Sequence, residues 1–110
     1  MKTIQVYSDP GHAWAKVPLK ELFDLGIAYE ISSFSYVRQQ SLSSGLNIFV
    51  YLEEDCDLGI YLKALRERNI EYKFKESHTN KRSKIRGYNT FMASLYLRLM
   101  ENSTNALKGF

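Results

Sequence analysis

The segment that most constrains the fold is Asn47–Glu53, which reads NIFVYLE. Side chains of an extended strand alternate between two faces, and in this segment both faces are apolar. One face carries Ile48, Val50 and Leu52, and the other carries Phe49 and Tyr51. Because a strand that is apolar on both faces is typical of the interior of a sheet, we expect this segment to be a central strand.

Patterns elsewhere in the chain predict further strands and helices. Alternating apolar residues, or runs rich in aromatic and β-branched residues, predict strands at 3–7, 13–17, 31–37 and 70–75. The polar stretch 38–46 is interpreted as a loop or hairpin tip. Helices are expected between Pro18 and Gly26, between Asp55 and Asn69, and over 89–100. This order predicts an α+β fold, with a small, mostly antiparallel sheet and two or three helices packed on one face.

The second half of the chain contains the clearest periodicities. An apolar stripe at helical spacing is formed by Leu58, Tyr61, Leu62 and Leu65. Alternation of Ile70, Tyr72 and Phe74 with charged residues predicts a strand with one buried face. The expected helix over 89–100 is apolar on more than one side, so we expect it to be deeply buried or to join two copies in a homodimer. Residues 1–100 are expected to form one domain and 101–110 a flexible tail.

Length and composition exclude several classes of protein. A chain of 110 residues that is 45% hydrophobic and 14% aromatic is large enough for one core and is not disordered as a whole. Cys56 is the only cysteine, which excludes an intrachain disulfide and fits a reducing compartment. The N-terminus lacks a signal-peptide pattern, and no apolar run is long enough to cross a bilayer. We therefore expect a cytoplasmic protein.

A basic loop over 78–88 is the strongest candidate for a binding site. Four permanent cations occur in it without an intervening carboxylate: Lys81, Arg82, Lys84 and Arg86. Arginine grips phosphate oxygens in pairs and lysine adds a point charge, so such a loop is typical of a site for a phosphate or a polyanion. His78 would add a donor, and Tyr88 would stack on a base. The alternative is a solvated loop that is polar for solubility.

The turn over 8–14 is a second candidate. It places His12 and Trp14 at the end of a strand, where a tight turn can form the rim of a pocket. Trp14 would stack on a planar ligand, and His12 would donate to a phosphate or act as an acid or base. In the alternative interpretation, Trp14 anchors the core and His12 satisfies a carbonyl of the loop.

The acidic run 53–57 (EEDCD) is interpreted as the start of a helix rather than a metal site. Packed carboxylates can hold a hard cation, but this run lacks the spaced ligands and central glycine of a calcium loop. Acidic residues also cap the free amides at a helix start, and Asp55 is the expected cap. Cys56 among these carboxylates is a poor nucleophile, because they disfavour its thiolate.

No complete catalytic motif is present in the sequence. There is no nucleophile elbow, no Cys-x-x-Cys pair, no His-Glu-x-x-His motif and no glycine-rich phosphate loop. We therefore expect neither an enzyme nor a bound cofactor, and we assign no catalytic or metal-binding residue. The alternative is a metal-free nuclease that uses His12 or His78.

Three blocks of sequence carry a resemblance to a known group of proteins. They are 8–14 (SDPGHAW), 50–57 (VYLEEDCD), and 78–80 with 83–88 (HTN and SKIRGY). Together they resemble small uncharacterised proteins of tailed bacteriophages, over a span from about Val6 to Tyr88. The resemblance implies a phage origin and the cytoplasm of a bacterial host. It also implies an accessory role against host defence.

The leading hypothesis is a non-enzymatic binding protein that counters host defence by sequestering a phosphate-bearing nucleotide. The four loop cations would neutralise the phosphates, while Trp14 or Tyr88 stacks on the base and His12 and His78 donate hydrogen bonds. One alternative is a protein–protein inhibitor of a host immune effector, like an anti-CRISPR protein. Another is a small accessory protein that binds nucleic acid, whose affinity would fall steeply with salt.

Overall fold

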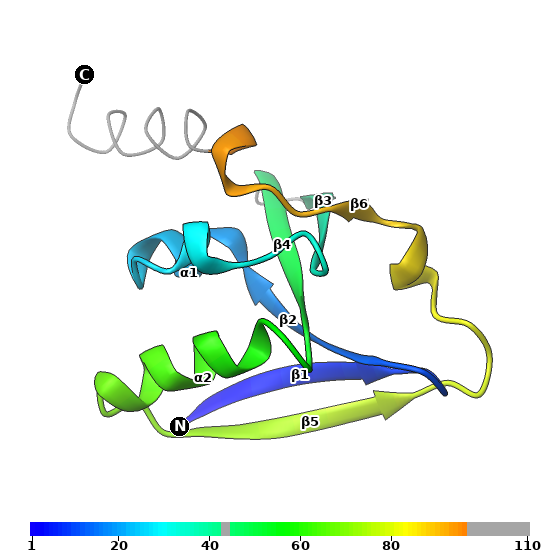
Figure 1. Cartoon of the computed structure of the whole chain (residues 1–110), viewed down its shortest axis with the longest axis horizontal. Coiled ribbons are helices and arrows are strands. Elements are labelled where there is room, and N and C mark those ends of the chain that lie inside the picture. Colours follow the sequence, from blue (N-terminus) through cyan, green and yellow to red (C-terminus); the bar gives the residue numbers. More distant parts are fainter. Residues whose placement is uncertain (43–44, 97–110) are drawn as a thin grey trace.

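The computed structural model describes residues 1–42 and 45–96. Its strands are β1 (Lys2–Ser8), β2 (Ala13–Pro18), β3 (Tyr36–Leu42), β4 (Gly45–Glu53), β5 (Tyr72–His78) and β6 (Asn89–Thr90) (Figure 1). The α-helices are α1 (Leu19–Asp24) and α2 (Leu58–Glu67). Short 3₁₀ helices are η1 (Ala28–Glu30), η2 (Lys84–Gly87) and η3 (Ala93–Leu95).

The strands form one sheet in the order β5-β1-β2-β4-β3-β6. Strand β4 lies between β2 and β3, so the prediction of a central strand over 47–53 is confirmed. Neighbouring strands are antiparallel except for β1 and β5, which are parallel. The α+β class is confirmed, but the sheet is mixed where a mostly antiparallel one was expected. Two α-helices are present in the described residues, at the lower end of the expected two or three.

The parallel pair arises from the position of α2 in the chain. Strand β4 runs in the same direction as β1, because each is antiparallel to β2. Helix α2 then returns the chain along the sheet, so that β5 starts beside the first residues of β1, with Lys2 opposite Tyr72. A parallel neighbour needs such a crossover, usually a helix. The sequence order of elements alone does not specify which strand β5 joins.

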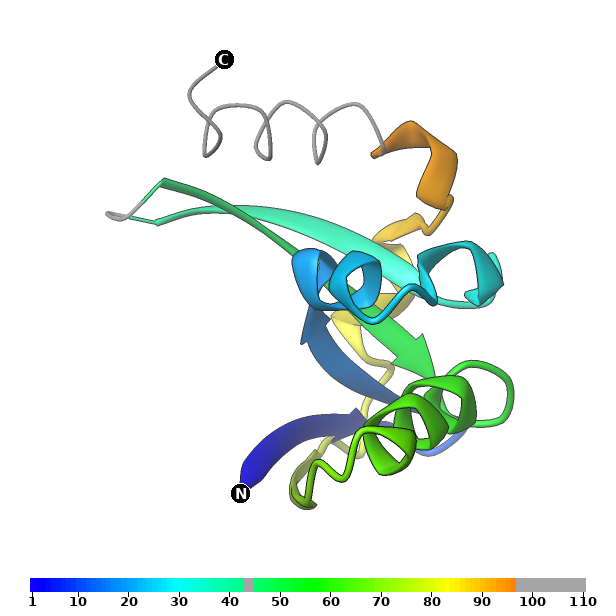
Figure 2. The ribbon, with the colours of Figure 1, turned by 90° about the vertical axis from the view of Figure 1, so that its left-hand side faces the viewer.

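The two faces of the sheet are covered by different parts of the chain. On the helix face, side chains of β1, β2 and β4 such as Val6, Val17 and Leu52 pack with those of α1 and α2 in one hydrophobic core. The opposite face, here called the loop face, carries Trp14 and Tyr51, which pack with Ile85 of η2. Figure 2 shows α1 and α2 in front of the sheet and the 79–88 segment behind it. Both apolar faces of β4 therefore pack against other parts of the chain, one against the helices and the other against the loop that contains η2.

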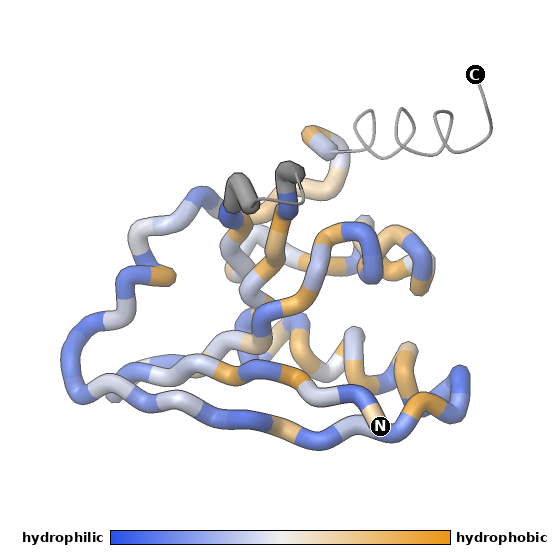
Figure 3. Tube along the Cα trace, turned by 180° about the vertical axis from the view of Figure 1, so that it is seen from behind, coloured by the Kyte–Doolittle hydropathy of each residue, from blue (hydrophilic) through white to orange (hydrophobic). Residues whose placement is uncertain are grey.

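Strand β5 departs from the predicted burial. Its first residue, Tyr72, is half-buried, but the remaining residues through His78 are exposed, including Phe74. The expectation of one buried face over 70–75 is therefore wrong for Ile70 and Phe74, which are both exposed, and only Tyr72 is half-buried. Strand β5 lies at the edge of the sheet and pairs with β1 alone, so its side chains lack the neighbours that bury β4. Figure 3 shows the mainly hydrophilic character of this strand.

The predicted strand over 31–37 and the polar stretch after it also need correction. The strand begins only at Tyr36 and continues to Leu42, through residues that were expected in a loop or hairpin tip. It pairs with β4 from Tyr36↔Tyr51 to Leu42↔Gly45, which makes this region the arms of a hairpin. Strand pairing uses backbone groups, so the polar residues Gln39 and Ser41 do not prevent it.

The predicted helix over 89–100 is wrong in its described part. Asn89 and Thr90 form β6 against β3, and the amide of Phe91 donates to the carbonyl of Ser35 at 2.8 Å. The edge of β3 supplies backbone partners here, and burial of Phe91 fixes the segment in an extended path. A homodimer through a helix at this position therefore has no support over 89–96. Residues 97–100 of that helix, and the tail 101–110, lie outside the described residues.

Helix ends agree with the sequence in one place and differ in another. Asn69 follows α2 with a φ of 58°, the left-handed conformation that ends helices, as the sequence predicted. The N-cap of α2 is Asp57 rather than Asp55, and the side chain of Asp57 makes no capping hydrogen bond to the first turn. In the described ranges, 1–42 and 45–96, no helix is both long enough and apolar enough to span a membrane.

Leu52 provides a test of the helix-face core. This side chain is fully buried, so we expect Leu52→Ala to lower the free energy of unfolding by about 2–5 kcal/mol, because it leaves a cavity. The matched control is Leu95→Ala at an exposed leucine, for which we expect a change within about 0.5 kcal/mol. Urea denaturation measures both, and equal effects would contradict the described core.

Candidate ligand-binding site

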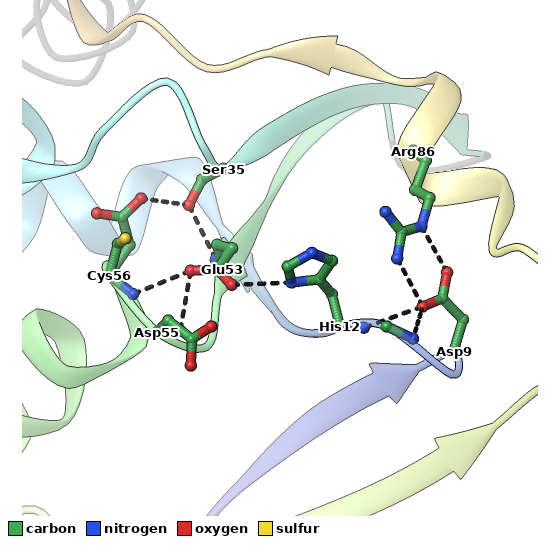
Figure 4. A network of polar contacts seen from close by, with 9 residues as sticks. Asp9, His12, Ser35, Glu53, Asp55, Cys56 and Arg86 are labelled. Carbon is green, nitrogen blue, oxygen red and sulfur yellow. Dashed lines mark hydrogen bonds and ion pairs between the residues drawn. The ribbon is translucent and has the colours of Figure 1, made fainter.

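The carboxylate of Asp9 joins the turn after β1 to the basic loop. Its side chain is 1% exposed. Within the turn it accepts hydrogen bonds from the amides of Gly11 and His12, at 2.9 and 3.0 Å (Figure 4). Across the fold it accepts from the amide of Ser83 at 2.9 Å, and from Nε and Nη2 of Arg86 at 2.7 and 2.9 Å. Two segments more than seventy residues apart are thereby held together.

The pairing with Asp9 gives Arg86 a structural role. The hydrogen bonds from Arg86, with that from the Ser83 amide, hold the pKa of Asp9 well below its usual range, and Asp9 raises the pKa of Arg86. The guanidinium carbon lies 5.4 Å from the centre of the Trp14 ring. A Cβ atom at Gly11 would stand 2.7 Å from Nη2 of Arg86, so glycine there permits the close approach. The positive charge of Arg86 is thus already balanced by the carboxylate of Asp9.

A pocket of about 550 Å³ lies between the loop face of the sheet and the 77–88 segment. We call it the basic pocket. Five cationic side chains contribute to its lining, two from the sheet and three from the loop: Lys16, Arg38, Lys81, Arg82 and Lys84. No carboxylate belongs to the described residues that line it. The pocket is therefore a site of concentrated positive charge.

The aromatic side chains of the basic pocket form a continuous cluster. The rings of Tyr51 and Tyr88 have centres 5.2 Å apart, and those of Tyr7 and Tyr51 are 6.4 Å apart. Arg38 Nη1 donates to the hydroxyl of Tyr88 at 2.7 Å and holds that ring in place. Burial, with the neighbouring Tyr88, raises the pKa of Tyr51 to about 12, so its phenol is neutral near pH 7. The cluster gives the pocket a flat, apolar component beside its charges.

His78 is oriented at the rim of the basic pocket by contacts at both ring nitrogens. Nδ1 lies 2.8 Å from the hydroxyl of Ser8, and Nε2 lies 3.1 Å from the side-chain oxygen of Asn80. The position of the ring therefore depends on the parallel pairing of β1 and β5, in which Ser8 stands opposite His78.

The structure divides the residues that the sequence selected between two places. The basic pocket is lined by His78, Lys81, Arg82, Lys84 and Tyr88. A separate hollow of about 270 Å³ is lined by His12, Trp14 and Arg86, with acidic residues from the end of β4. Trp14 is 2% exposed and packs against Tyr36 and Ile85, as a core side chain does. The 8–14 turn and the 78–88 loop are thus joined through Asp9, but His12 and Trp14 border a different hollow from that of the five loop residues named above.

Sequence reasoning missed the contribution of the sheet to the basic pocket. Lys16, Arg38, Tyr7 and Tyr51 all line it from the loop face. Alternation along β4 did place Tyr51 on the face opposite Leu52. The strand register, which sets Lys16 and Tyr36 on either side of Tyr51, could not be predicted. Local sequence does not specify how strands that are distant in the chain pair.

The acidic run 53–57 forms a turn that ends at Asp57, the N-cap residue of α2, whose side chain does not cap the helix. Oε2 of Glu53 accepts from the amides of Asp55 and Cys56, at 2.8 and 2.9 Å. Asp57 is buried and accepts from the hydroxyls of Ser32 and Ser35. The prediction that Asp55 caps α2 is therefore wrong, because the carboxylates satisfy amides and hydroxyls of neighbouring turns. Desolvation and the carboxylate of Glu53 raise the pKa of the Cys56 thiol.

The lowered pKa of Asp9 leads to a prediction about the stability of the protein in acid. Its pKa is lowered in the folded protein from an ordinary value of 3.8, so the stability it provides is present above that value. That stability is lost as the pH falls further, because the unfolded chain binds the proton more readily. We expect Asp9→Asn to lower the free energy of unfolding near neutral pH and to flatten its decline in acid.

Urea denaturation at a series of pH values between about 6 and 2.5 measures this difference. The control is Asp24→Asn, at an exposed carboxylate that pairs with Lys20 on the same helix, and the pH dependence of this variant should follow that of the unaltered protein. An equally steep decline in Asp9→Asn would contradict the anchoring role of Asp9.

Comparison of the chain with protein-family models, with curated proteins and with solved structures gives no match in any of the three. The expected kinship with phage proteins therefore stays a prediction, and no activity can be transferred from a relative. The features that bear on function are the residues that line the basic pocket, those that line the smaller hollow, and the contact between Asp9 and Arg86.

Proposed function

We propose that the protein binds a phosphate-bearing nucleotide in the basic pocket and holds it without chemical change. The observation that carries this proposal is the composition of the lining, in which five cations face an aromatic cluster and no described lining residue is acidic. In the setting that the phage resemblance implies, such capture would sequester a nucleotide used as a signal by host defence.

The charge of the pocket is available to a ligand. Among residues 1–42 and 45–96, no carboxylate lies within 4.0 Å of the terminal nitrogens of the five lining cations. Arg86 differs from them, because Asp9 neutralises it. Unmatched cations that converge on a concave surface attract phosphate, and arginine can contact two of its oxygens at once.

The aromatic cluster favours a nucleotide over a bare phosphate as the ligand of the basic pocket. Tyr88 and Tyr7 are half-buried, which leaves part of each ring open to the pocket, and Tyr51 lies beneath them. Aromatic rings in binding sites stack on bases of any sequence. The volume of about 550 Å³ also falls within the usual range for small-molecule sites, about 300–1,000 Å³.

Removal of one loop cation tests the role of charge. We expect Arg82→Ala to weaken nucleotide binding at least about tenfold, because a hydrogen bond to a charged group contributes roughly 1.5–3 kcal/mol. Isothermal titration calorimetry with ATP, ADP, AMP and a cyclic dinucleotide measures the affinity of each variant. The matched control, Lys63→Ala, removes the same charge from an exposed position on α2 and should leave the affinity unchanged.

Two results of this titration would overturn the proposal. One is the absence of binding for every nucleotide in the panel, and the other is an equal loss in Arg82→Ala and Lys63→Ala. Binding of single-stranded RNA alone, with an affinity that falls steeply with salt, would favour the nucleic-acid alternative instead.

Tyr88 tests the contribution of stacking separately. We expect Tyr88→Leu to weaken binding of the tightest nucleotide by roughly five- to 150-fold, which corresponds to about 1–3 kcal/mol for one stacked base. Binding of inorganic pyrophosphate, which has no base, should change much less. The control Tyr29→Leu alters an exposed tyrosine outside the pocket. Equal losses for nucleotide and pyrophosphate would show that Tyr88 acts on the phosphates or on the fold.

A further inference from the structure

A second cluster of polar side chains lies outside the basic pocket, where the turn after β1 meets the end of β4. Glu53 stands opposite Trp14 in the β2–β4 pairing, and the amide of Glu54 donates to the carbonyl of Ala13 at 3.1 Å. This register brings the carboxylates after β4 beside the imidazole of His12. One ligand atom from each of His12, Glu53, Glu54 and Asp55 lies within 4.8 Å of the others.

Glu53 is the buried member of this cluster, with a side chain that is 9% exposed. Its Oε2 is fixed by the amides of Asp55 and Cys56, but its buried Oε1 accepts no hydrogen bond from any residue that the structure describes. Nδ1 of His12 lies 3.4 Å from this oxygen, which is beyond the usual 2.7–3.2 Å of an N–H···O bond (Figure 4). A buried carboxylate oxygen without a donor is unfavourable, and a cation between it and the imidazole would satisfy both.

The separation of these two atoms fits a metal ion. Two ligands that each lie about 2.0–2.1 Å from a tetrahedral ion are about 3.3–3.4 Å apart. The distance from Nδ1 of His12 to Oε1 of Glu53 is 3.4 Å. Glu54 and Asp55 are exposed, so their side chains are free to rotate and complete the coordination. The backbone hydrogen bonds to Oε2 would hold Glu53 in orientation, as outer contacts do for metal ligands.

The donor set indicates the class of ion. One imidazole with carboxylates suits a first-row divalent ion such as Zn²⁺, since sites for Mg²⁺ and Ca²⁺ are built from oxygen alone. Arg86 lines the same hollow, but its charge is matched by Asp9 and does not oppose a cation there. We propose that His12, Glu53, Glu54 and Asp55 form a binding site for one divalent transition-metal ion. This proposal is independent of nucleotide binding in the basic pocket.

Zinc binding to the nucleotide-free protein tests this assignment. We expect one Zn²⁺ per chain, measured by competition with a colorimetric chelator. His12→Ala should weaken the affinity at least about tenfold, the scale seen even for outer contacts of metal sites. This variant keeps the backbone amide that donates to Asp9, so the anchor of the turn is preserved. His78→Ala removes the other histidine of the chain, at the basic pocket, and should bind zinc as the unaltered protein does.

Two further variants define the ligands. Glu53→Gln should weaken zinc binding as His12→Ala does, with circular dichroism and thermal melting used to confirm that it folds. Cys56→Ser and Arg82→Ala should leave zinc binding intact, because neither side chain belongs to the cluster.

The proposal is overturned by a stoichiometry well below one, by an equal loss in His12→Ala and His78→Ala, or by a dependence on Cys56. Loss of nucleotide binding in Arg82→Ala with zinc affinity retained would separate the two sites experimentally.

Discussion

The contact between Asp9 and Arg86 is the interaction on which the loop face depends. A buried carboxylate can be stable only when its oxygens are satisfied, and Asp9 achieves this with backbone amides from its own turn and with Ser83 and Arg86 from the basic loop. The contact fixes the start of η2, which lets Ile85 pack against Trp14 and Tyr51. It acts together with the packing of Ile85 and the hydrogen bond from the Thr79 amide to the Ser8 carbonyl, which also hold the loop against the sheet although its cations repel one another.

Strand β4 connects this anchor to the rest of the fold. Its aliphatic side chains belong to the core beneath the two helices, while Tyr51 on its other face supports the basic pocket. The same strand ends at Glu53, whose backbone amide donates to Ser35 and whose side chain reaches toward His12. One segment thus serves the hydrophobic core and both hollows. Changes in its register would disturb all three together, because a shift by one residue exchanges the two faces.

The sequence predicted those parts of the fold that depend on local pattern. The central position of β4, the stripe of α2 and the stop at Asn69 follow from alternation, helical spacing and backbone preference. Prediction from the sequence failed where residues that are distant in the chain determine the conformation or the burial of a segment. Phe91 lies in a sequence with helical spacing but is held extended by Ser35. Phe74 alternates like a buried residue but stands on an edge strand. At the candidate site, the loop cations Lys81, Arg82 and Lys84 line the basic pocket, and their role in binding stays a prediction. The sequence did not indicate the partner of Arg86, which is Asp9. Nothing near Arg86 in sequence marks Asp9 as its neighbour.

The position of Trp14 makes its fluorescence a probe of the surrounding residues. It is the only tryptophan in the chain, and its buried indole nitrogen has no hydrogen-bond partner among residues 1–42 and 45–96. Its ring centre lies 6.1 Å from that of His12 and 5.4 Å from the guanidinium carbon of Arg86. Because indole fluorescence responds to nearby charge and to heavy or paramagnetic ions, the emission of the native protein arises from one residue beside the acidic cluster and the loop anchor. The chain thus carries its own optical reporter for this junction, without any added label.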